Sequence, residues 1–252
     1  MVGSPVPERT AEPTTKSEWR KVLLASRRLV PAHQHATEAS ALVDRLIEGL
    51  TGASRAAPSN PSANRGPDPP TASSDGSPGT SILPTPSTVH GSPVLSEGPV
   101  CAYVPVGTEP GSLALLDALL DIGRDVLLPV LPRNPQSSAA MDWGFYRGPD
   151  SLTEGPYRLR QPRGPLLHAS AITSAPVVLI PALAVDQHGV RLGRGAGWYD
   201  RTLPLARTDA ALVAIVRDQE LISRLPSEPH DVLMTGVLTP LGGLRALPLA
   251  LD

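Results

Sequence analysis

The apolar positions of this chain follow two periods, one typical of buried strands and one typical of helices. Continuous apolar runs at 100–104, 126–131, 177–180 and 211–216 are typical of strands buried on both faces of a parallel sheet. Between the first two runs, residues 112–122 repeat leucine at helical spacing. A strand, a helix and a strand at this separation form a βαβ unit, so the pattern predicts an α/β fold with a parallel sheet.

Two helices are predicted ahead of the first strand. Thr14 or Thr15 is a candidate N-cap for a helix that begins near Lys16, and Pro31 breaks that helix. A second helix is predicted from about 33 to 50, with an apolar stripe along one face. The remaining predicted elements are a strand or edge excursion at 141–146, a helical turn at 218–220 and a last strand at 232–239.

The composition of the chain changes at residue 51. Ten of the 30 prolines lie between residues 51 and 99, and no aromatic residue does. Such a segment cannot bury enough apolar surface to offset its ordering entropy, so 51–97 is predicted to be a disordered insertion. A linker between two domains is the alternative, but it would leave the first 50 residues as a helical hairpin too small to be stable. We therefore expect a loose tail at 1–13 and a single domain formed by 14–50 and 98–252.

Charge and cysteine content exclude several classes of protein. The net charge of −2 does not suit a nucleic-acid partner, which would require a basic patch. Cys101 is the single cysteine, which excludes an internal disulfide and a cysteine-based metal site. No apolar run approaches the roughly 18 residues of a membrane span, and the first residues lack the apolar core of a secretory signal. We expect a cytoplasmic monomer that binds small molecules and neither nucleic acid nor membrane.

The most informative stretch is a glycine-rich loop at 191–197, which follows a buried strand and leads into a helix predicted to start near Trp198. Its three glycines alternate with other residues, and arginines stand at 191 and 194. Glycine lets the backbone adopt positive φ and present its N–H groups, and guanidinium groups also donate to phosphate. The spacing matches neither a dinucleotide fingerprint nor a P-loop. A tight turn is therefore the alternative to a phosphate site.

Two aspartates follow loops and are candidate ligands of a divalent cation. Asp200 comes directly after the glycine-rich loop, and Asp231 ends a second loop beside His230. Mg²⁺ binds through one or two carboxylates plus substrate phosphates, which two loop aspartates near a phosphate site would supply. Each aspartate alone is also typical of a helix cap or turn. His230 is a candidate metal ligand or base, but the sequence has no Cys or His cluster for zinc.

Three other groups of residues each allow a structural and a functional interpretation. Lys16 and Arg20 lie on one helix face and form either a solvated basic surface or a pair that reaches an anion. Glu109 follows the first strand and is either a solvated turn residue or an acceptor for the amino groups of a heterocycle. The aromatic residues at 141–146 either cover the sheet or form a wall for a flat ring.

Together these motifs resemble the 5-formyltetrahydrofolate cyclo-ligase family, also called 5,10-methenyltetrahydrofolate synthetases. The resemblance covers about 16–50 and 99–242. Its motifs are Arg-Leu-Gly-x-Gly-x-Gly-(Tyr/Trp)-Tyr-Asp-Arg at 191–201, Lys-x-x-x-Arg at 16–20, Tyr-x-Pro-x-x-x-Glu-Pro at 103–110, Trp-x-x-Tyr at 143–146, and Pro-x-Glu-x-His-Asp followed by Thr at 226–239. There are departures: Trp198 stands where Tyr is more usual, Gln161 stands where Glu is common, and 51–97 has no counterpart.

The resemblance implies a three-layer α/β/α Rossmann-like open sheet and an enzyme that couples ATP hydrolysis to ring closure. It implies that 5-formyltetrahydrofolate becomes 5,10-methenyltetrahydrofolate with Mg²⁺ as cofactor and ATP as co-substrate, releasing ADP and phosphate. A non-catalytic formylfolate-binding protein of the same fold and another Rossmann-like enzyme acting on sugar phosphates are the alternatives.

The resemblance also implies site residues. Those expected to act in catalysis are Arg194, Lys16 and Asp200. Those expected at ATP are Lys16, Arg20, Arg191, Leu192, Gly193, Arg194, Gly195, Ala196, Gly197, Trp198 and Tyr199. Those expected at the folate are Val104, Glu109, Trp143, Tyr146, Gly195, Trp198 and Tyr199. The expected metal ligands are Asp200 and Asp231.

Overall fold

The computed structural model describes residues 13–52, 97–132, 134 and 139–248. The predicted tail at 1–13 and the predicted insertion at 51–97 therefore lie outside the described residues, apart from residues 13, 51, 52 and 97. Every helix within the described ranges is too short or too polar to span a bilayer.

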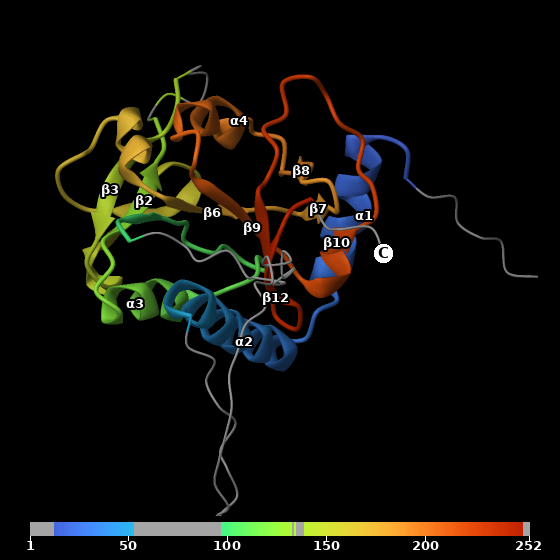
Figure 1. Ribbon diagram of the computed structural model, residues 1–252, viewed down its shortest axis with the longest axis horizontal. Coiled ribbons are helices and arrows are strands. Elements are labelled where there is room, and N and C mark those ends of the chain that lie inside the picture. Colours follow the sequence, from blue (N-terminus) through green and yellow to red (C-terminus); the bar gives the residue numbers. More distant parts are fainter. Residues whose placement is uncertain (1–12, 53–96, 133, 135–138, 249–252) are drawn as a thin grey trace, which may run out of the picture. The chain divides into compact units, whose positions relative to one another are not determined.

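A seven-stranded sheet forms the centre of the fold (Figure 1). Its spatial order is β12-β11-β9-β6-β1-β2-β3; the five inner strands are parallel, and β12 and β3 pair antiparallel at the edges. The strands are β1 (Val100–Cys101), β2 (Val126–Val130), β3 (Asp142–Tyr146), β6 (Val177–Pro181), β9 (Ala211–Ile215), β11 (Gly236–Thr239) and β12 (Gly243–Ala246). The predicted βαβ unit is confirmed by β1, α3 (Leu113–Asp121) and β2.

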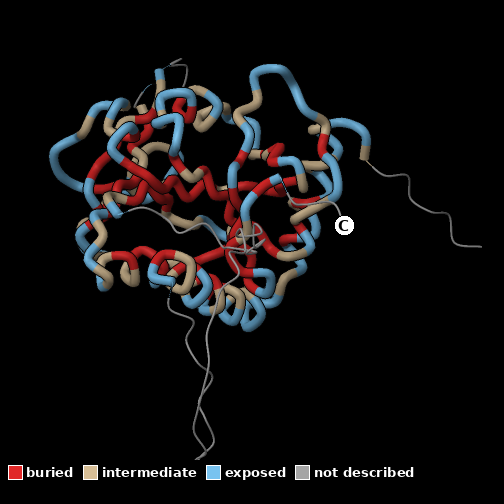
Figure 2. The backbone as a smooth tube through the Cα atoms, in the orientation of Figure 1, coloured by how far each residue is buried: buried red, intermediate tan, exposed pale blue. Residues whose placement is uncertain are grey.

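The inner strands β1, β2, β6 and β9 are apolar at every position because both faces of the sheet are covered. In β6, Val177 and Leu179 join one core cluster with α2 (Ala32–Thr51) and α3. Val178 and Ile180 point to the opposite face and join a second cluster. Figure 2 shows the buried strands between more exposed outer elements. The expected three-layer arrangement is therefore confirmed.

The two outer layers differ in their secondary structure. Helices α2 and α3 cover one face, where the leucines of both helices pack against the strands (Figure 1). The other face is covered by short elements: the 3-10 helices η3 (Ala169–Ser174) and η4 (Leu203–Leu205) and the short helix α4 (Trp198–Thr202). This leaves the glycine-rich loop, which directly precedes α4, close to the sheet.

Helix α1 (Lys16–Arg28) begins where the sequence predicts. Thr15 is its N-cap, and Thr15 and Glu18 form a reciprocal capping box. Hydrogen bonds from the backbone N–H groups of Thr14 and Thr15 to the Glu18 carboxylate lower its pKa to about 2. The apolar side of α1 packs through Leu23 on a small three-stranded sheet. That sheet contains β7 (Ala184–Asp186), β8 (Arg191–Leu192) and β10 (Leu221–Ile222). The sequence analysis did not predict this sheet.

The last predicted strand begins later than expected. The expectation was 232–239, but β11 starts at Gly236. The reason is that the N–H of Met234 donates to the carbonyl of Gly189, at 2.7 Å, and so is not available for a hydrogen bond to a neighbouring strand of the sheet. Other short elements are η1 (Pro149–Ser151), β4 (Leu152–Glu154), η2 (Pro156–Arg158), β5 (Arg160–Pro162) and η5 (Asp218–Glu220).

A buried network of ion pairs joins the first two helices to the turn after β9. Glu220 accepts from Arg27 with both carboxylate oxygens, at 2.6 and 2.7 Å, and from the backbone N–H of Arg217 at 2.9 Å. Arg217 in turn pairs with Glu38 on α2 at 2.6 Å. Two cations and two anions balance here, so the network is buried without a net charge of its own.

The order of the strands creates a topological switch point between β1 and β6. From β1 the chain continues through α3 to β2 on one side, whereas from β6 it continues to β9 on the other. The loops that leave the carboxyl ends of these two neighbours diverge. In open α/β sheets, ligands bind in the crevice between such loops.

Candidate active site

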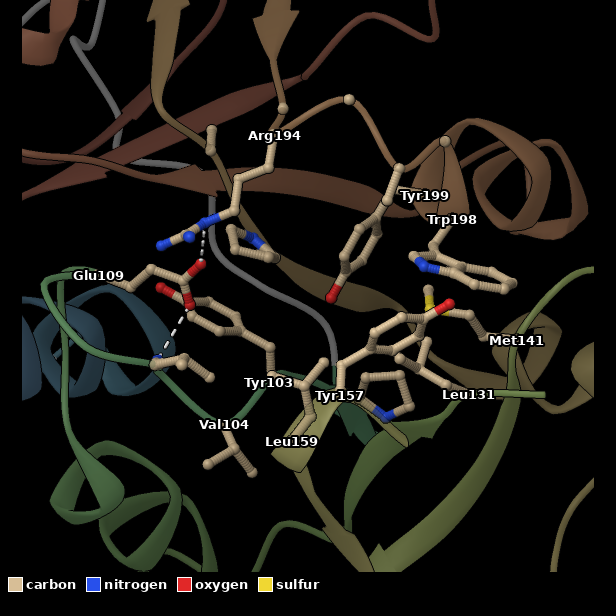
Figure 3. A pocket seen from close by; sticks show the side chains of 18 of the residues that line it. Tyr103, Val104, Glu109, Leu131, Met141, Tyr157, Leu159, Arg194, Trp198 and Tyr199 are labelled. Atoms are coloured by element: carbon tan, nitrogen blue, oxygen red, sulfur yellow. Dashed lines mark hydrogen bonds and ion pairs between the residues drawn. The ribbon is translucent and has the colours of Figure 1, made fainter. Parts of the chain in front are cut away.

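A cavity of about 510 Å³ lies at this switch point. Residues after β1 line it, including Tyr103 and Val104, as do Pro181 and Ala182 at the end of β6 and the loop that leads to Asp200. Figure 3 shows side chains from these separate segments pointing into one pocket. The switch point and the glycine-rich loop thus form a single site.

The glycine-rich loop has the backbone that its sequence predicts. Gly195 and Gly197 have φ of +99° and +71°, which favour glycine over residues with a side chain. Arg20 supports the loop from α1, because its Nε donates to the carbonyl of Gly193 at 2.9 Å. The guanidinium of Arg20 also packs against Gly195, where a side chain would bring a Cβ to within 3.5 Å of the guanidinium carbon. The structure therefore brings Arg20 and the loop together.

Arg191 and Asp200 form an ion pair beside the loop. The guanidinium of Arg191 also lies over the ring of Tyr199, 5.5 Å from its centroid. Asp200 lines the pocket and its side chain is 44% exposed, so its carboxylate can also meet a bound ligand. Arg201 lies over the ring of Trp198 at 4.6 Å and fixes that aromatic side chain.

Glu109 and Arg194 meet across the pocket. Arg194 Nε lies 2.9 Å from Glu109 Oε1, as the dashed line in Figure 3 shows. Glu109 also accepts from the backbone N–H of Val106 at 3.0 Å and is only 12% exposed, whereas Arg194 is 50% exposed. A residue expected at the phosphates and a residue expected at the folate are thus direct neighbours.

Trp143 and Tyr146 do not form the expected aromatic wall, and this expectation needs correction. Both are fully buried, and neither lines the pocket. They are three positions apart on β3, so they point to opposite faces of the sheet. Trp143 packs in the second core cluster, and Tyr146 packs in the first, where its hydroxyl donates to Asp117 at 2.6 Å.

Other aromatic residues line the pocket instead. Tyr157 from η2 lies with Trp198 and Tyr199 on one side, away from the Glu109–Arg194 pair (Figure 3). Tyr157 is 58% exposed and has a positive φ of 59°, which is unusual for a residue with a side chain. The sequence analysis missed it. The available signal was an aromatic residue within a glycine- and proline-rich segment, where a buried core position is not expected.

Lys16 and Asp231 form a second group beside α1. Lys16 Nζ donates to both oxygens of Asp231 at 2.9 Å and to Glu228 at 2.7 Å. Burial alone would raise the pKa of Asp231, but hydrogen bonds from Lys16 and from the N–H of Glu228 lower it. Glu228, His230 and Asp231 each offer a ligand atom within 4.8 Å of the others. The two expected metal ligands, Asp200 and Asp231, therefore have different partners in this structure.

Tyr103 and Tyr199 both line the pocket. Burial raises the pKa of both Tyr103 and Tyr199, so both hydroxyls stay protonated. Tyr103 uses its hydroxyl to donate to the carbonyl of Pro110 at 2.9 Å, which closes the turn that carries Glu109. Burial also raises the pKa of Cys101, which makes this thiol a poor nucleophile.

Known proteins share this fold. An NMR structure of 5,10-methenyltetrahydrofolate synthetase from Aquifex aeolicus superimposes with a TM-score of 0.63 at 18% identity, covering 94% of this chain and 95% of that one. A 5,10-methenyltetrahydrofolate synthetase from Mycoplasma pneumoniae superimposes with a TM-score of 0.55 at 14% identity, covering 88% of this chain and 96% of that one. At these identities the likeness concerns the fold alone, and it confirms the predicted fold class.

Sequence comparison is more specific. The chain is 55% identical over 155 residues to a 5-formyltetrahydrofolate cyclo-ligase of Mycolicibacterium smegmatis, covering 61% of this chain and 79% of that protein. It is 28% identical over 149 residues to that of Escherichia coli, covering 59% of this chain and 81% of that protein. The model of the 5-formyltetrahydrofolate cyclo-ligase family matches residues 92–240. This confirms the resemblance that the motifs indicated, and the chain belongs to the 5-formyltetrahydrofolate cyclo-ligase family.

Proposed function

We propose that this protein converts 5-formyltetrahydrofolate to 5,10-methenyltetrahydrofolate in a reaction that depends on ATP and Mg²⁺. The observation that supports this best is the pair formed by Glu109 and Arg194, at 2.9 Å. It joins a glycine-rich loop suited to phosphate and an aromatic-lined cavity suited to a flat ring. Transfer of a phosphoryl group from ATP to a folate requires the two substrates to be bound next to each other, as this pair of residues would allow.

The chemistry explains why ATP is needed. An N-formyl group is an amide, whose oxygen is a poor leaving group. Transfer of the γ-phosphoryl group of ATP to the formyl oxygen turns that oxygen into a phosphate leaving group. Nitrogen 10 of the folate then attacks the activated carbon, the five-membered ring closes, and the products are ADP and phosphate. No protein nucleophile is required, so the protein contributes positioning and charge stabilisation.

Cations and backbone donors serve the phosphates in this proposal. Arg194 lines the pocket from the glycine-rich loop and its side chain is half exposed. Its guanidinium can therefore donate hydrogen bonds to the phosphoryl group as that group is transferred. Arg20 supports the loop, and the backbone N–H groups of a glycine-rich loop can donate to phosphate. Lys16 is paired with Glu228 and Asp231 here, and we propose that phosphate competes for its ammonium group.

The acidic residues present fit a hard cation that binds together with phosphates. Asp200 lines the pocket with a partly exposed carboxylate, and we propose it as the protein ligand nearest the reaction. Asp231 is proposed as a further ligand once Lys16 turns from it toward phosphate. Bound Mg²⁺ would neutralise charge on the phosphate oxygens during transfer.

The folate ring is proposed to lie between the aromatic side and Glu109. A pterin has amino and ring N–H groups that can donate hydrogen bonds to the Glu109 carboxylate. Its flat faces can stack on the rings of Tyr157, Trp198 and Tyr199. Val104 lines the same cavity. That the protein is a cytoplasmic monomer stays a prediction.

Glu109→Gln is expected to weaken binding of 5-formyltetrahydrofolate by roughly 10- to 150-fold, because hydrogen bonds to a charged group contribute about 1.5–3 kcal/mol. Isothermal titration calorimetry measures the Kd without turnover. Glu154→Gln is the matched control, because Glu154 is exposed on β4 and does not line the pocket. An unchanged Kd for Glu109→Gln would remove Glu109 from the folate site.

Asp200→Asn is expected to lower kcat by at least about a hundredfold at a fixed Mg²⁺ concentration, because loss of a metal ligand removes several kcal/mol of charge stabilisation. Titration with Mg²⁺ distinguishes loss of a metal ligand from misfolding, since Asp200→Asn should need a higher Mg²⁺ concentration than wild type for half-maximal activity. Asp209→Asn is the control, because Asp209 is an exposed carboxylate paired with Arg207 outside the pocket. Wild-type Mg²⁺ dependence in Asp200→Asn would disprove the ligand assignment.

A further inference from the structure

The segment that carries Glu109 is not held by regular secondary structure. It runs from the end of β1 to the start of α3 and includes Gly107 with a φ of +61°. Its internal hydrogen bonds are few: the N–H of Glu109 donates to the carbonyl of Val106 at 3.1 Å, the Glu109 carboxylate accepts from the N–H of Val106, and the Tyr103 hydroxyl donates to the carbonyl of Pro110. Other contacts must therefore set the direction in which Glu109 points.

One such contact comes from the far side of the site. Arg217 lies two residues after β9, and its Nη1 donates to the carbonyl of Thr108 at 3.1 Å. Thr108 immediately precedes Glu109. The side chain of Arg217 is only 1% exposed, so water does not compete for this bond. Arg217 does not line the pocket, and none of the proposed substrate contacts uses it.

The guanidinium of Arg217 is itself held in a fixed orientation. Its Nε donates to Glu38 at 2.6 Å, its Nη2 lies 3.1 Å from His35 Nδ1, and Glu220 Oε1 lies 3.5 Å from its Nη1. The planar fork of an arginine can serve these acceptors and the Thr108 carbonyl together. A lysine provides a point charge on a flexible stem and cannot reproduce this geometry.

We propose that Arg217 is a positioning residue for folate recognition, acting through the Thr108 carbonyl on Glu109. The inference rests on the proposed function of Glu109 as the acceptor for the folate. Helix α2, which supplies His35 and Glu38, is thereby linked to the pocket without touching the substrate.

Arg27 provides a comparison within the same network, although unlike Arg217 it also lines the pocket, so its own effect on the Kd need not be small. It is equally buried, shares Glu220 with Arg217, and also donates to a backbone carbonyl, that of Ala182 at 2.6 Å. Ala182 follows β6 and is remote in sequence from Glu109. Replacing either arginine with lysine disturbs the buried network, but only Arg217→Lys removes the hydrogen bond to the Thr108 carbonyl.

The test is a double-mutant cycle on the Kd of 5-formyltetrahydrofolate, measured by calorimetry at a temperature where circular dichroism shows each variant folded. Arg217→Lys should weaken binding about tenfold in the wild-type background and less than about twofold in the Glu109→Gln background. Arg27→Lys should change the Kd by the same factor in both backgrounds. An equal effect of Arg217→Lys in both backgrounds would overturn the inference.

Two further results keep the outcomes distinct. If Glu109→Gln alone leaves the Kd unchanged, the proposed function of Glu109 fails, whatever Arg217 does. A measurement on the unmodified protein avoids variants that do not fold: addition of 5-formyltetrahydrofolate should shift the NMR signals of the Arg217 guanidinium, because its Thr108 bond adjusts with Glu109. An unshifted Arg217 signal at saturating folate would contradict the inference.

Discussion

Arg194→Met is expected to lower kcat by roughly 10²- to 10³-fold while the protein stays folded. Charge develops on the transferred phosphoryl group, and removal of one donor aimed at such charge costs about this much. Arg194 is the half-exposed guanidinium of the glycine-rich loop that faces Glu109, so its loss removes a cation at the proposed junction of the two substrates. Steady-state kinetics at saturating ATP, folate and Mg²⁺ measure the effect.

Two comparisons make this result specific to the site. Arg207→Met should keep wild-type kcat, because Arg207 pairs with Asp209 at the surface and does not line the pocket. The Kd of the folate should be measured alongside kcat, since Arg194→Met also frees Glu109 from its ion pair. A kcat within about threefold of wild type would show that Arg194 does not stabilise the reacting phosphoryl group.

Glu220→Gln is expected to lower the free energy of unfolding by about 3–5 kcal/mol, because it leaves a buried cation without its partner. Glu220 accepts from Arg27 with both oxygens, and the two side chains are 4% and 2% exposed. Urea unfolding followed by circular dichroism measures the change.

The exposed pair of Arg45 and Glu48 on α2 provides the matched control for this prediction. Their side chains are 44% and 25% exposed, and Glu48→Gln should cost no more than about 0.5 kcal/mol. If Glu220→Gln were as mild as Glu48→Gln, the buried network would not be a major source of stability.

The parts of the fold that depend on local pattern could be predicted from the sequence. Apolar runs located the inner strands, because each is buried on both faces. Alternating glycines located the loop, because Gly195 and Gly197 require positive φ. The order of the strands was not accessible in this way, since hydrophobic pattern does not say which strands are neighbours. The switch point between β1 and β6 is therefore a finding of the structure.

The errors at the site have physical causes. Trp143 and Tyr146 were grouped by composition, although a spacing of three on a strand directs them to opposite faces. Tyr157 was missed because it lies outside any periodic apolar pattern, in a segment where its backbone has a positive φ. The ion pair of Lys16 with Asp231 was not predicted either, because it joins positions 215 apart in the chain, which no local pattern encodes. Their expected contacts with phosphate and metal stay predictions.

The proposed conversion predicts one optical signal. Mixing the protein with 5-formyltetrahydrofolate, ATP and Mg²⁺ should produce the absorbance band of methenyltetrahydrofolate, and omission of ATP or addition of a Mg²⁺ chelator should abolish it. Arg194→Met provides the matched sample, in which the band should grow far more slowly. Absence of the band with folded protein and all components, or its growth without ATP, would contradict the proposed function.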